Sequence, residues 1–275
     1  MKTHLVKAGD GTVLAVDEAG DPAGPPILFI HGYSQSRLCW HRQMTGILAA
    51  RHRLVAMDMR GHGLSSRPHD AYGDSRAWAD DVAAVIEALA LDRPVLSAWS
   101  YGGALLCDYV RFHGTEGIAG LQFVAAVSKL GKPALAYLGA DFLALMKGFV
   151  STDAEASVAA LENLTALVPA APLDPLEAAS LLGEAVIVPP HVRRALFSRP
   201  PENDDPLPQI ACPVLLTHGS ADRVILPSLS EHHASLMPNA TLSRFEGFGH
   251  APFLEATDRF DRELAAFVAT ARAAG

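Results

Sequence analysis

Three residues far apart in the chain, Ser100, Asp222 and His250, carry side chains that together could perform nucleophilic chemistry. A serine hydroxyl is a weak nucleophile until a base removes its proton, and the base in turn needs a carboxylate that orients it. The three residues follow one another in the order serine, aspartate, histidine, an order in which such triads occur. We therefore predict that Ser100 is a nucleophile, His250 its general base and Asp222 the orienting acid.

Ser100 lies within the sequence AWSYG at 98–102, directly after a predicted strand over 95–99 and before a helical stretch. This is the context of a nucleophile elbow, a sharp strand-to-helix turn that projects a side chain above the sheet. Small residues are needed two positions before and after the serine, because neighbouring backbones approach closely there. Ala98 occupies the first of these positions, where glycine is commoner, and is larger than glycine by one methyl group. The alternative interpretation of Ser100 is an ordinary serine cap at a helix start.

Acyl transfer also needs backbone N–H groups that face the developing oxyanion, and losing one such donor costs about 10²–10³ in rate. We predict that the amide of Tyr101, directly after the nucleophile, is one donor. The second is predicted to be the amide of Tyr33, in the sequence IHGY at 30–33, where Gly32 lets the loop turn. His31 is more typical of a buried, hydrogen-bonded side chain than of a base.

The choice of His250 among twelve histidines depends on its position in a glycine-rich loop after a predicted strand at 241–245. A loop in this position reaches the carboxyl edge of a parallel sheet, where ligands bind. Asp222 follows another predicted strand, 214–216, and falls at the same edge. By contrast, two adjacent pairs of basic residues are predicted to lie on solvated helix surfaces: His232 with His233, and Arg193 with Arg194.

Short apolar runs recur along the chain and alternate with helical stretches. The runs that fit strands buried on both faces are 27–30, 54–57, 95–99, 121–127 and 214–216. The helical stretches are 75–91, 101–112 and 253–273. Asp10-Gly11 indicates a hairpin near the start of the chain. This alternation predicts an α/β fold, with a mostly parallel central sheet flanked by helices.

The alternation stops between about residues 131 and 208, where alanine and leucine are frequent and no convincing strand occurs. We predict a helical insertion, the cap, at 132–205, and assign the α/β core to 1–131 and 206–275. Thr152 and Glu155 have the spacing of a capping box at the start of one helix. Four apolar residues of the insertion either line a pocket or pack in the core: Phe142, Leu143, Leu145 and Met146.

Composition excludes several classes of protein. An apolar share of 49% with 19% charged residues excludes a disordered chain. A net charge of −8 argues against nucleic acid and anionic membranes as partners. Without a secretory signal or a spanning segment, and with three widely spaced cysteines, we expect a cytoplasmic location. No spacing of metal ligands or cofactor fingerprint occurs, so no metal or organic cofactor is predicted. The oligomeric state is left open.

These segments resemble the α/β-hydrolase fold family over about residues 10–272, and within it the esterase, lactonase and cofactor-free haloperoxidase (perhydrolase) branch. The matching residues are His31-Gly32, Asp58-x-Arg60-Gly61-x-Gly63-x-Ser65, the elbow at Ser100, His218-Gly219-x-x-Asp222 and Gly249-His250. The resemblance implies that the segment 58–65 is a structural turn. It also implies that the insertion is a cap domain between the sixth and seventh family strands.

Serine rather than aspartate at the elbow implies attack on a carbonyl. We therefore expect hydrolysis of a carboxylic ester or lactone through an acyl-enzyme. The mostly apolar cap predicts a fairly hydrophobic substrate of small to medium size. Three alternatives stay open: carbon–carbon bond hydrolysis or perhydrolysis on the same triad, and a non-catalytic receptor for a small ligand on this fold.

Overall fold

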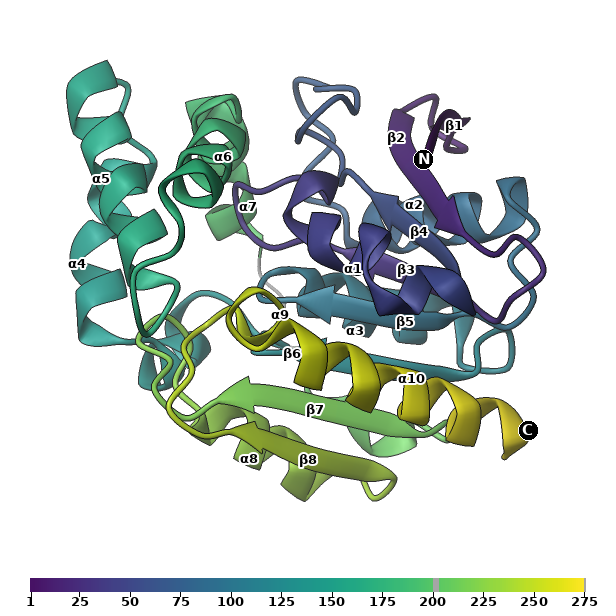
Figure 1. Cartoon of the computed structure of the whole chain (residues 1–275). Helices are drawn as coiled ribbons and strands as arrows, with labels where there is room; N and C mark the ends of the chain where they lie inside the picture. The colour runs from purple at the N-terminus through teal and green to yellow at the C-terminus, as the bar shows by residue number, and fades with distance from the viewer. Residues whose placement is uncertain (200–202, 275) are drawn as a thin grey trace.

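The computed structural model describes residues 1–199 and 203–274. Within them, an eight-stranded sheet crosses the molecule in the order β1-β2-β4-β3-β5-β6-β7-β8 (Figure 1). The strands are β1 (Lys2–Lys7), β2 (Val13–Gly20), β3 (Pro26–Ile30), β4 (Arg53–Met57), β5 (Val95–Trp99), β6 (Gly120–Val124), β7 (Val214–Gly219) and β8 (Ala240–Phe245). β1 and β2 form the predicted hairpin, β2 and β4 pair antiparallel, and the remaining pairs are parallel. The predicted α/β class is confirmed.

The central strands β3, β5, β6 and β7 are buried along their whole length, as their continuous apolar runs predict. The run at 121–127 is the exception, because β6 ends at Val124. The next residue, Ala125, has a φ of 44° and turns the chain out of the sheet. The strand that precedes the predicted insertion is therefore shorter than its apolar pattern.

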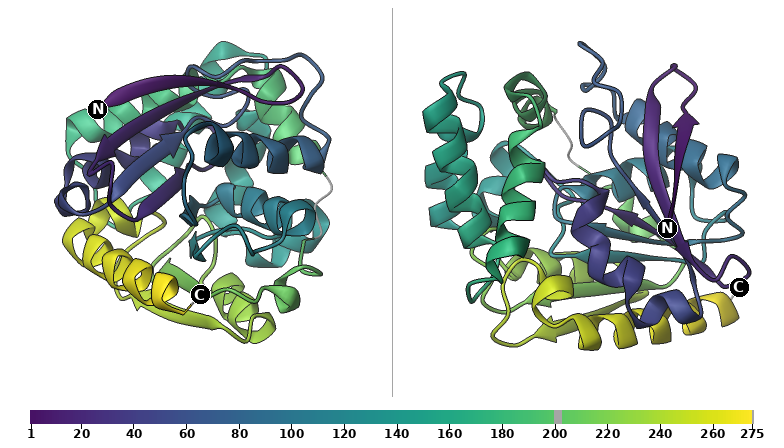
Figure 2. Two further views of the ribbon diagram at one scale, coloured as in Figure 1. Left: turned by 90° about the vertical axis from the view of Figure 1, so that its right-hand side faces the viewer. Right: turned by 45° about the horizontal axis from the view of Figure 1, so that its top comes forward.

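Helices cover both faces of the sheet. α1 (His41–Thr45) and α10 (Thr257–Ala273) lie on one face, with α9 (Pro252–Glu255) at the start of α10. α2 (Ser75–Ala88), α3 (Gly102–His113) and α8 (Ser228–Leu236) lie on the other (Figures 1 and 2). In none of the described ranges is a helix both long and apolar enough to cross a membrane.

Beyond the carboxyl ends of the parallel strands, a separate group of helices occupies the predicted insertion (Figure 1). These are α4 (Ala140–Phe149), α5 (Ala154–Leu167), α6 (Pro175–Val186) and α7 (Pro190–Ser198). They lie between β6 and β7 in the chain, and residues 200–202 of the insertion fall outside the described ranges. The predicted capping box is wrong: Asp153, not Thr152, caps α5, because its carboxylate accepts the amide of Ala156 at 2.8 Å. The division into core and cap stays a prediction.

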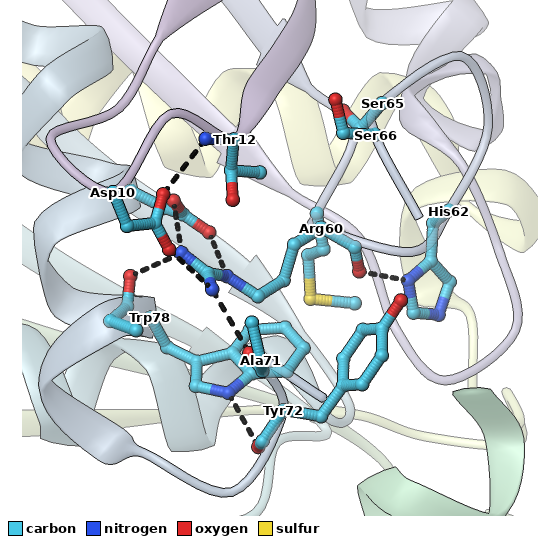
Figure 3. A network of polar contacts seen from close by, with 12 residues as sticks. Asp10, Thr12, Arg60, His62, Ser65, Ser66, Ala71, Tyr72 and Trp78 are labelled. Carbon is cyan, nitrogen blue, oxygen red and sulfur yellow. Dashed lines mark hydrogen bonds and ion pairs between the residues drawn. The ribbon is translucent and has the colours of Figure 1, made fainter. Parts of the chain in front are cut away.

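The segment 58–65 is held together by the buried guanidinium of Arg60. It forms two hydrogen bonds with Asp81 of α2, at 2.6 and 2.7 Å, and one with Asp10 at 3.0 Å. Figure 3 shows it between Asp10 and the indole of Trp78, 5.8 Å from the ring centre. Arg60 thus ties the hairpin loop and α2 to the turn after β4, which fits the structural role that the resemblance implies for this turn.

We expect Asp81→Ala to lower the free energy of unfolding by about 3–5 kcal/mol, because it removes the buried carboxylate that accepts two hydrogen bonds from Arg60 and leaves, among the described residues, only the partly exposed Asp10 as its ion-pair partner. Denaturant unfolding followed by circular dichroism measures the change. The control is Asp80→Ala, whose side chain is 43% exposed and which should cost about 0–1 kcal/mol. A loss at Asp81 no larger than the control's would contradict the role assigned to Arg60.

Candidate active site

Ser100 occupies a strained turn between β5 and α3. Its φ of 54° lies in the left-handed region, which non-glycine residues rarely adopt. The turn is held from the β6 side, since the amide of Ser100 donates to the carbonyl of Val124 at 2.9 Å and the amide of Val127 donates to the carbonyl of Ser100 at 3.0 Å. Strain of this kind persists only where the surroundings over-determine it. The local geometry is therefore that of a nucleophile elbow.

Glycines make this turn possible because backbones and side chains crowd it. A Cβ on Gly32 would lie 2.9 Å from Cβ of Ser100, and one on Gly103 would lie 2.6 Å from the carbonyl oxygen of Val127. The alternative interpretation of Ser100 as a helix cap is wrong. α3 begins after Tyr101 without a side-chain cap, and the Ser100 hydroxyl bonds a histidine instead.

The structure brings Ser100, His250 and Asp222 together in one hydrogen-bonded chain. Ser100 Oγ lies 2.9 Å from His250 Nε2, and His250 Nδ1 lies 2.7 Å from Asp222 Oδ2. Because a carboxylate can only accept, Nδ1 carries the proton and Nε2 is free to accept the serine proton. All three side chains are buried, with exposed fractions of 8% for Ser100, 2% for His250 and 4% for Asp222.

Asp222 lies in the turn that follows β7, and its carboxylate is fully engaged. Oδ1 accepts the amides of Val224 at 2.8 Å and Ile225 at 3.0 Å, while Oδ2 faces His250. Burial by itself would raise the pKa of Asp222. The charge of His250 and the hydrogen bonds from His218 and His250 outweigh burial and bring this pKa down to about 2. Asp222 is thus ionised at neutral pH.

The loop that carries His250 is held by residues that sequence reasoning missed. The amide of His250 donates to the carbonyl of Val168, just after α5, at 2.7 Å. Glu255 of α9 accepts the amide of Gly249 at 3.0 Å, and Trp99 Nε1 donates to the carbonyl of His250 at 2.8 Å. Glu255 carried a sequence signal, as an acid in a short helix directly after a glycine-rich loop, whereas Val168 leaves none. The predicted insertion therefore helps to place the base.

The two predicted oxyanion donors flank the serine. Within the described residues, the amides of Tyr33 and Tyr101 donate to no protein acceptor, so both are available to a ligand. His31 is buried, and its Nδ1 lies 2.8 Å from the carbonyl of Gly32 while its Nε2 accepts the amide of Met59 at 3.0 Å. Burial lowers the pKa of His31 to about 3. It is a neutral residue that shapes the loop, as predicted.

A mostly apolar cavity of about 120 Å³ opens beside Ser100, between the sheet and the inserted helices. Its apolar lining includes Trp99, Val127, Val224, Phe142, Met146 and Leu164. Of the four apolar residues proposed for the pocket, Phe142 and Met146 line it, while Leu143 and Leu145 are not among the lining residues. Positions 142 and 146 are one helical turn apart and share the inner face of α4.

The prediction of two solvated basic pairs is half wrong. Arg194 is exposed, but Arg193 is 2% exposed and donates to Ser157 Oγ at 2.6 Å between α7 and α5. His232 is partly exposed, but His233 is fully buried, with its Nε2 2.9 Å from Ser128 Oγ. Adjacent residues on a helix point about 100° apart, so one of each pair faces inward.

A further contact missed from the sequence joins the insertion to the loop after β3. Oε2 of Glu184 in α6 accepts the amide of Ser36 at 3.1 Å and its hydroxyl at 2.9 Å. Ser36 lies three residues after Tyr33, so α6 helps to hold the loop that carries a predicted oxyanion donor. Burial raises the pKa of Glu184 to about 7, although the hydrogen bonds from Ser36 oppose the shift.

Comparisons with known proteins agree with this fold. The family model described as alpha/beta hydrolase fold matches residues 25–257. A non-heme chloroperoxidase of Streptomyces lividans is 30% identical, covering 96% of this chain and 98% of its own. A bifunctional esterase/perhydrolase of Acinetobacter calcoaceticus is 27% identical over the same shares of each chain. The crystal structure of an esterase from Rhodococcus sp. ECU1013 is 35% identical with a TM-score of 0.93, covering 98% of this chain and 99% of its own.

The raised pKa of Glu184 makes a prediction about stability. Its pKa of about 7 in the folded chain lies above the ordinary 4.5, so the folded state binds this proton more tightly than the unfolded chain. The stability that this proton contributes is fully present below pH 4.5 and is lost as the pH rises through about 7. Glu184→Gln cannot ionise and should lose less stability than the wild type between about pH 5 and about pH 8.

Urea unfolding at the two pH values measures this difference. The control is Glu162→Gln, an exposed position of α5, which should follow the wild-type pH dependence. If Glu184→Gln follows it as well, Glu184 does not titrate as described.

Proposed function

This chain belongs to the α/β-hydrolase fold family, and on that premise we propose that it hydrolyses carboxylic esters or lactones through an acyl-enzyme formed on Ser100. The observation that carries the proposal is the hydrogen-bonded chain from Ser100 through His250 to Asp222, buried beside an apolar cavity. A receptor for a small ligand has no need of a serine aligned with a histidine and an ionised carboxylate. The esterase names of relatives support the same class of reaction.

The first half of the proposed reaction forms the acyl-enzyme. Ser100 Oγ attacks the carbonyl carbon while His250 Nε2 takes its proton, and the carbonyl oxygen becomes an oxyanion. The unpaired amides of Tyr33 and Tyr101 donate to this oxygen, and each is expected to contribute about 10²–10³ in rate. The ionised Asp222 stabilises the imidazolium that forms on His250. The intermediate then collapses, and His250 gives its proton to the leaving alcohol oxygen.

The second half of the reaction repeats these steps with water. His250 Nε2 takes a proton from a water molecule, whose oxygen attacks the acyl carbon. The same two amides stabilise the second oxyanion, and the proton on His250 returns to Ser100 Oγ as the acid leaves. With a lactone substrate, the alcohol and acid formed belong to one molecule, so the two halves give a single hydroxy acid.

The cavity indicates the size and polarity of the substrate. An apolar cavity of about 150 Å³ is large enough to hold benzene, so a cavity of about 120 Å³ suits a short acyl chain or a small ring. Lys129 at its edge forms an ion pair with Asp204 at 2.5 Å, which neutralises its charge. We therefore propose an uncharged, fairly hydrophobic ester or lactone of small to medium size.

A second candidate is perhydrolysis, in which hydrogen peroxide replaces water in the second half and the product is a peracid. The names of two relatives favour it, a non-heme chloroperoxidase and a bifunctional esterase/perhydrolase. Bromination of a phenol dye in acetate buffer with bromide and hydrogen peroxide detects the peracid. Carbon–carbon bond hydrolysis uses the same triad, and a screen with vinylogous diketones would reveal it.

We also propose a cytoplasmic location, with a small-molecule ester or lactone as substrate and neither nucleic acid nor a membrane as a partner. Cys39 and Cys107 are buried free thiols and Cys212 is a partly buried one, which fits a reducing compartment. The net charge of −8 disfavours binding to phosphate-rich nucleic acids and anionic membranes. Cell fractionation tests the location.

We expect Ser100→Ala to lower kcat for p-nitrophenyl butyrate by roughly 10⁴-fold or more, because removal of a triad nucleophile leaves only the contribution of binding and the oxyanion donors. The control is Ser235→Ala, an exposed serine of α8, which should keep the wild-type rate. An acyl series from acetyl to dodecanoyl should show a fall in kcat/KM at the long chains. A wild-type rate of hydrolysis in Ser100→Ala would contradict the proposed mechanism.

A further inference from the structure

Asp222 is in contact with a second histidine that the mechanism above does not use. His218 lies near the end of β7 and is 1% exposed. Its Nε2 is 3.0 Å from Oδ2 of Asp222, the same oxygen that faces His250. Its Nδ1 is 2.6 Å from the hydroxyl of Ser230 in α8. The hydrogen-bonded chain that begins at Ser100 therefore continues past Asp222 into the core.

The surroundings of His218 decide where its proton lies. Nε2 has two neighbours, the carboxylate of Asp222 and the carbonyl oxygen of Ile225 at 2.9 Å, and both can only accept. Nε2 must therefore carry a hydrogen and donate it. In the neutral ring Nδ1 is then an acceptor, and the hydroxyl of Ser230 is its donor. Ser230 in this way satisfies the remaining nitrogen of the tautomer that Asp222 and the carbonyl of Ile225 require.

With His218 as a donor, the carboxylate of Asp222 receives four N–H groups. Oδ1 takes the amides of Val224 and Ile225, and Oδ2 takes the two imidazoles. Rotation of the carboxylate would break several of these bonds at once. The oxygen offered to His250 is thus held in one position, from the β7 side as well as from the backbone of the turn.

We propose that His218 is a positioning residue for the reaction, donating to Asp222 so that one carboxylate oxygen stays aligned with His250. The inference rests on the proposed function, since it concerns the same triad. The His218 donor also disperses part of the carboxylate charge. Without it, Asp222 would stabilise the imidazolium of His250 more strongly, and the base would stay protonated to a higher pH.

Few other charged groups face this pair. Among the described residues, the electrostatic partners of Asp222 are His250 from the following loop and His218 from its own strand. His233 of α8 faces His218, and burial lowers the pKa of His233 to about 3, so it is neutral. The effect of removing the His218 donor therefore reaches His250 through Asp222 alone.

The test uses a fluorophosphonate that labels an activated serine, because this reaction needs the triad but no knowledge of the substrate. Labelling of Ser100 is followed by mass spectrometry across pH. His218→Phe keeps a ring but no N–H, and we expect labelling to slow by roughly 10- to 100-fold, the range for loss of an outer hydrogen-bond partner at metal sites. The acid limb of its pH–rate profile, which is the fall in the labelling rate at low pH, should move to higher pH.

Two further variants separate positioning from packing. His218→Gln can place an amide N–H near the position of Nε2 and should restore most of the rate and the wild-type acid limb. Ser230→Ala keeps the ring but removes the donor to Nδ1, and should slow labelling less than His218→Phe does. The control is His233→Phe, which alters a buried histidine of the same region without touching Asp222 and should leave rate and limb unchanged.

The outcomes separate this inference from the proposed function. If the wild type is not labelled at Ser100, the proposed function fails. If the wild type is labelled and His218→Phe reacts as fast with the same acid limb, His218 does not position Asp222. Equal losses in His218→Phe and His218→Gln would also overturn the inference, because they indicate packing alone. If His218→Phe does not fold, the other two variants decide. The positioning role of His218 is overturned if Ser230→Ala is labelled at the wild-type rate while His218→Gln is labelled more slowly.

Discussion

The site depends on one backbone constraint, the left-handed turn at Ser100. A non-glycine residue in this region is strained, and the turn persists because hydrogen bonds to Val124 and Val127 hold it on one side while Gly32 leaves room on the other. The same turn directs the side chain away from the α3 amides and toward His250. It also leaves the amide of Tyr101 unpaired beside the hydroxyl. The proposed nucleophile and one predicted oxyanion donor thus lie on the same distorted turn of the chain.

The inserted helices take part in the geometry of the site as well as covering it. Val168, after α5, accepts the amide of His250, and Glu184 of α6 binds the loop that carries Tyr33. The hydroxyl of Tyr101 donates to the carbonyl of Leu196 in α7 at 3.2 Å. Movement of these helices would therefore alter the base and both predicted oxyanion donors together. The shape of the cavity and the alignment of the reacting groups are mechanically coupled.

Burial disfavours the charged form of every ionisable group near the sheet edge, but hydrogen-bond partners outweigh it at Asp222. Burial keeps His31 and His233 neutral, with pKa values of about 3, because within the described ranges neither ring has a carboxylate as a hydrogen-bond partner. Asp222 is equally buried, yet its pKa falls to about 2 because the charge of His250 and the hydrogen bonds from His218 and His250 outweigh burial. The protein thus holds one stable negative charge behind a base, while nearby histidines contribute shape without charge.

The sequence by itself determined the α/β fold and the identity of the residues that meet at the site. Apolar runs, glycines around Ser100 and the positions of Asp222 and His250 after strands are local signals, and parallel strands bring such positions to one edge. The sequence was misleading about which member of a basic pair on a helix is buried, as at Arg193 and His233. Adjacent residues can be of the same type, but their side chains point in different directions. The contacts of Val168 and Glu184 join segments far apart in the chain, and the contact of Ser230 joins α8 to β7. Only the tertiary structure decided these, because they depend on packing between elements and leave no spacing in the sequence.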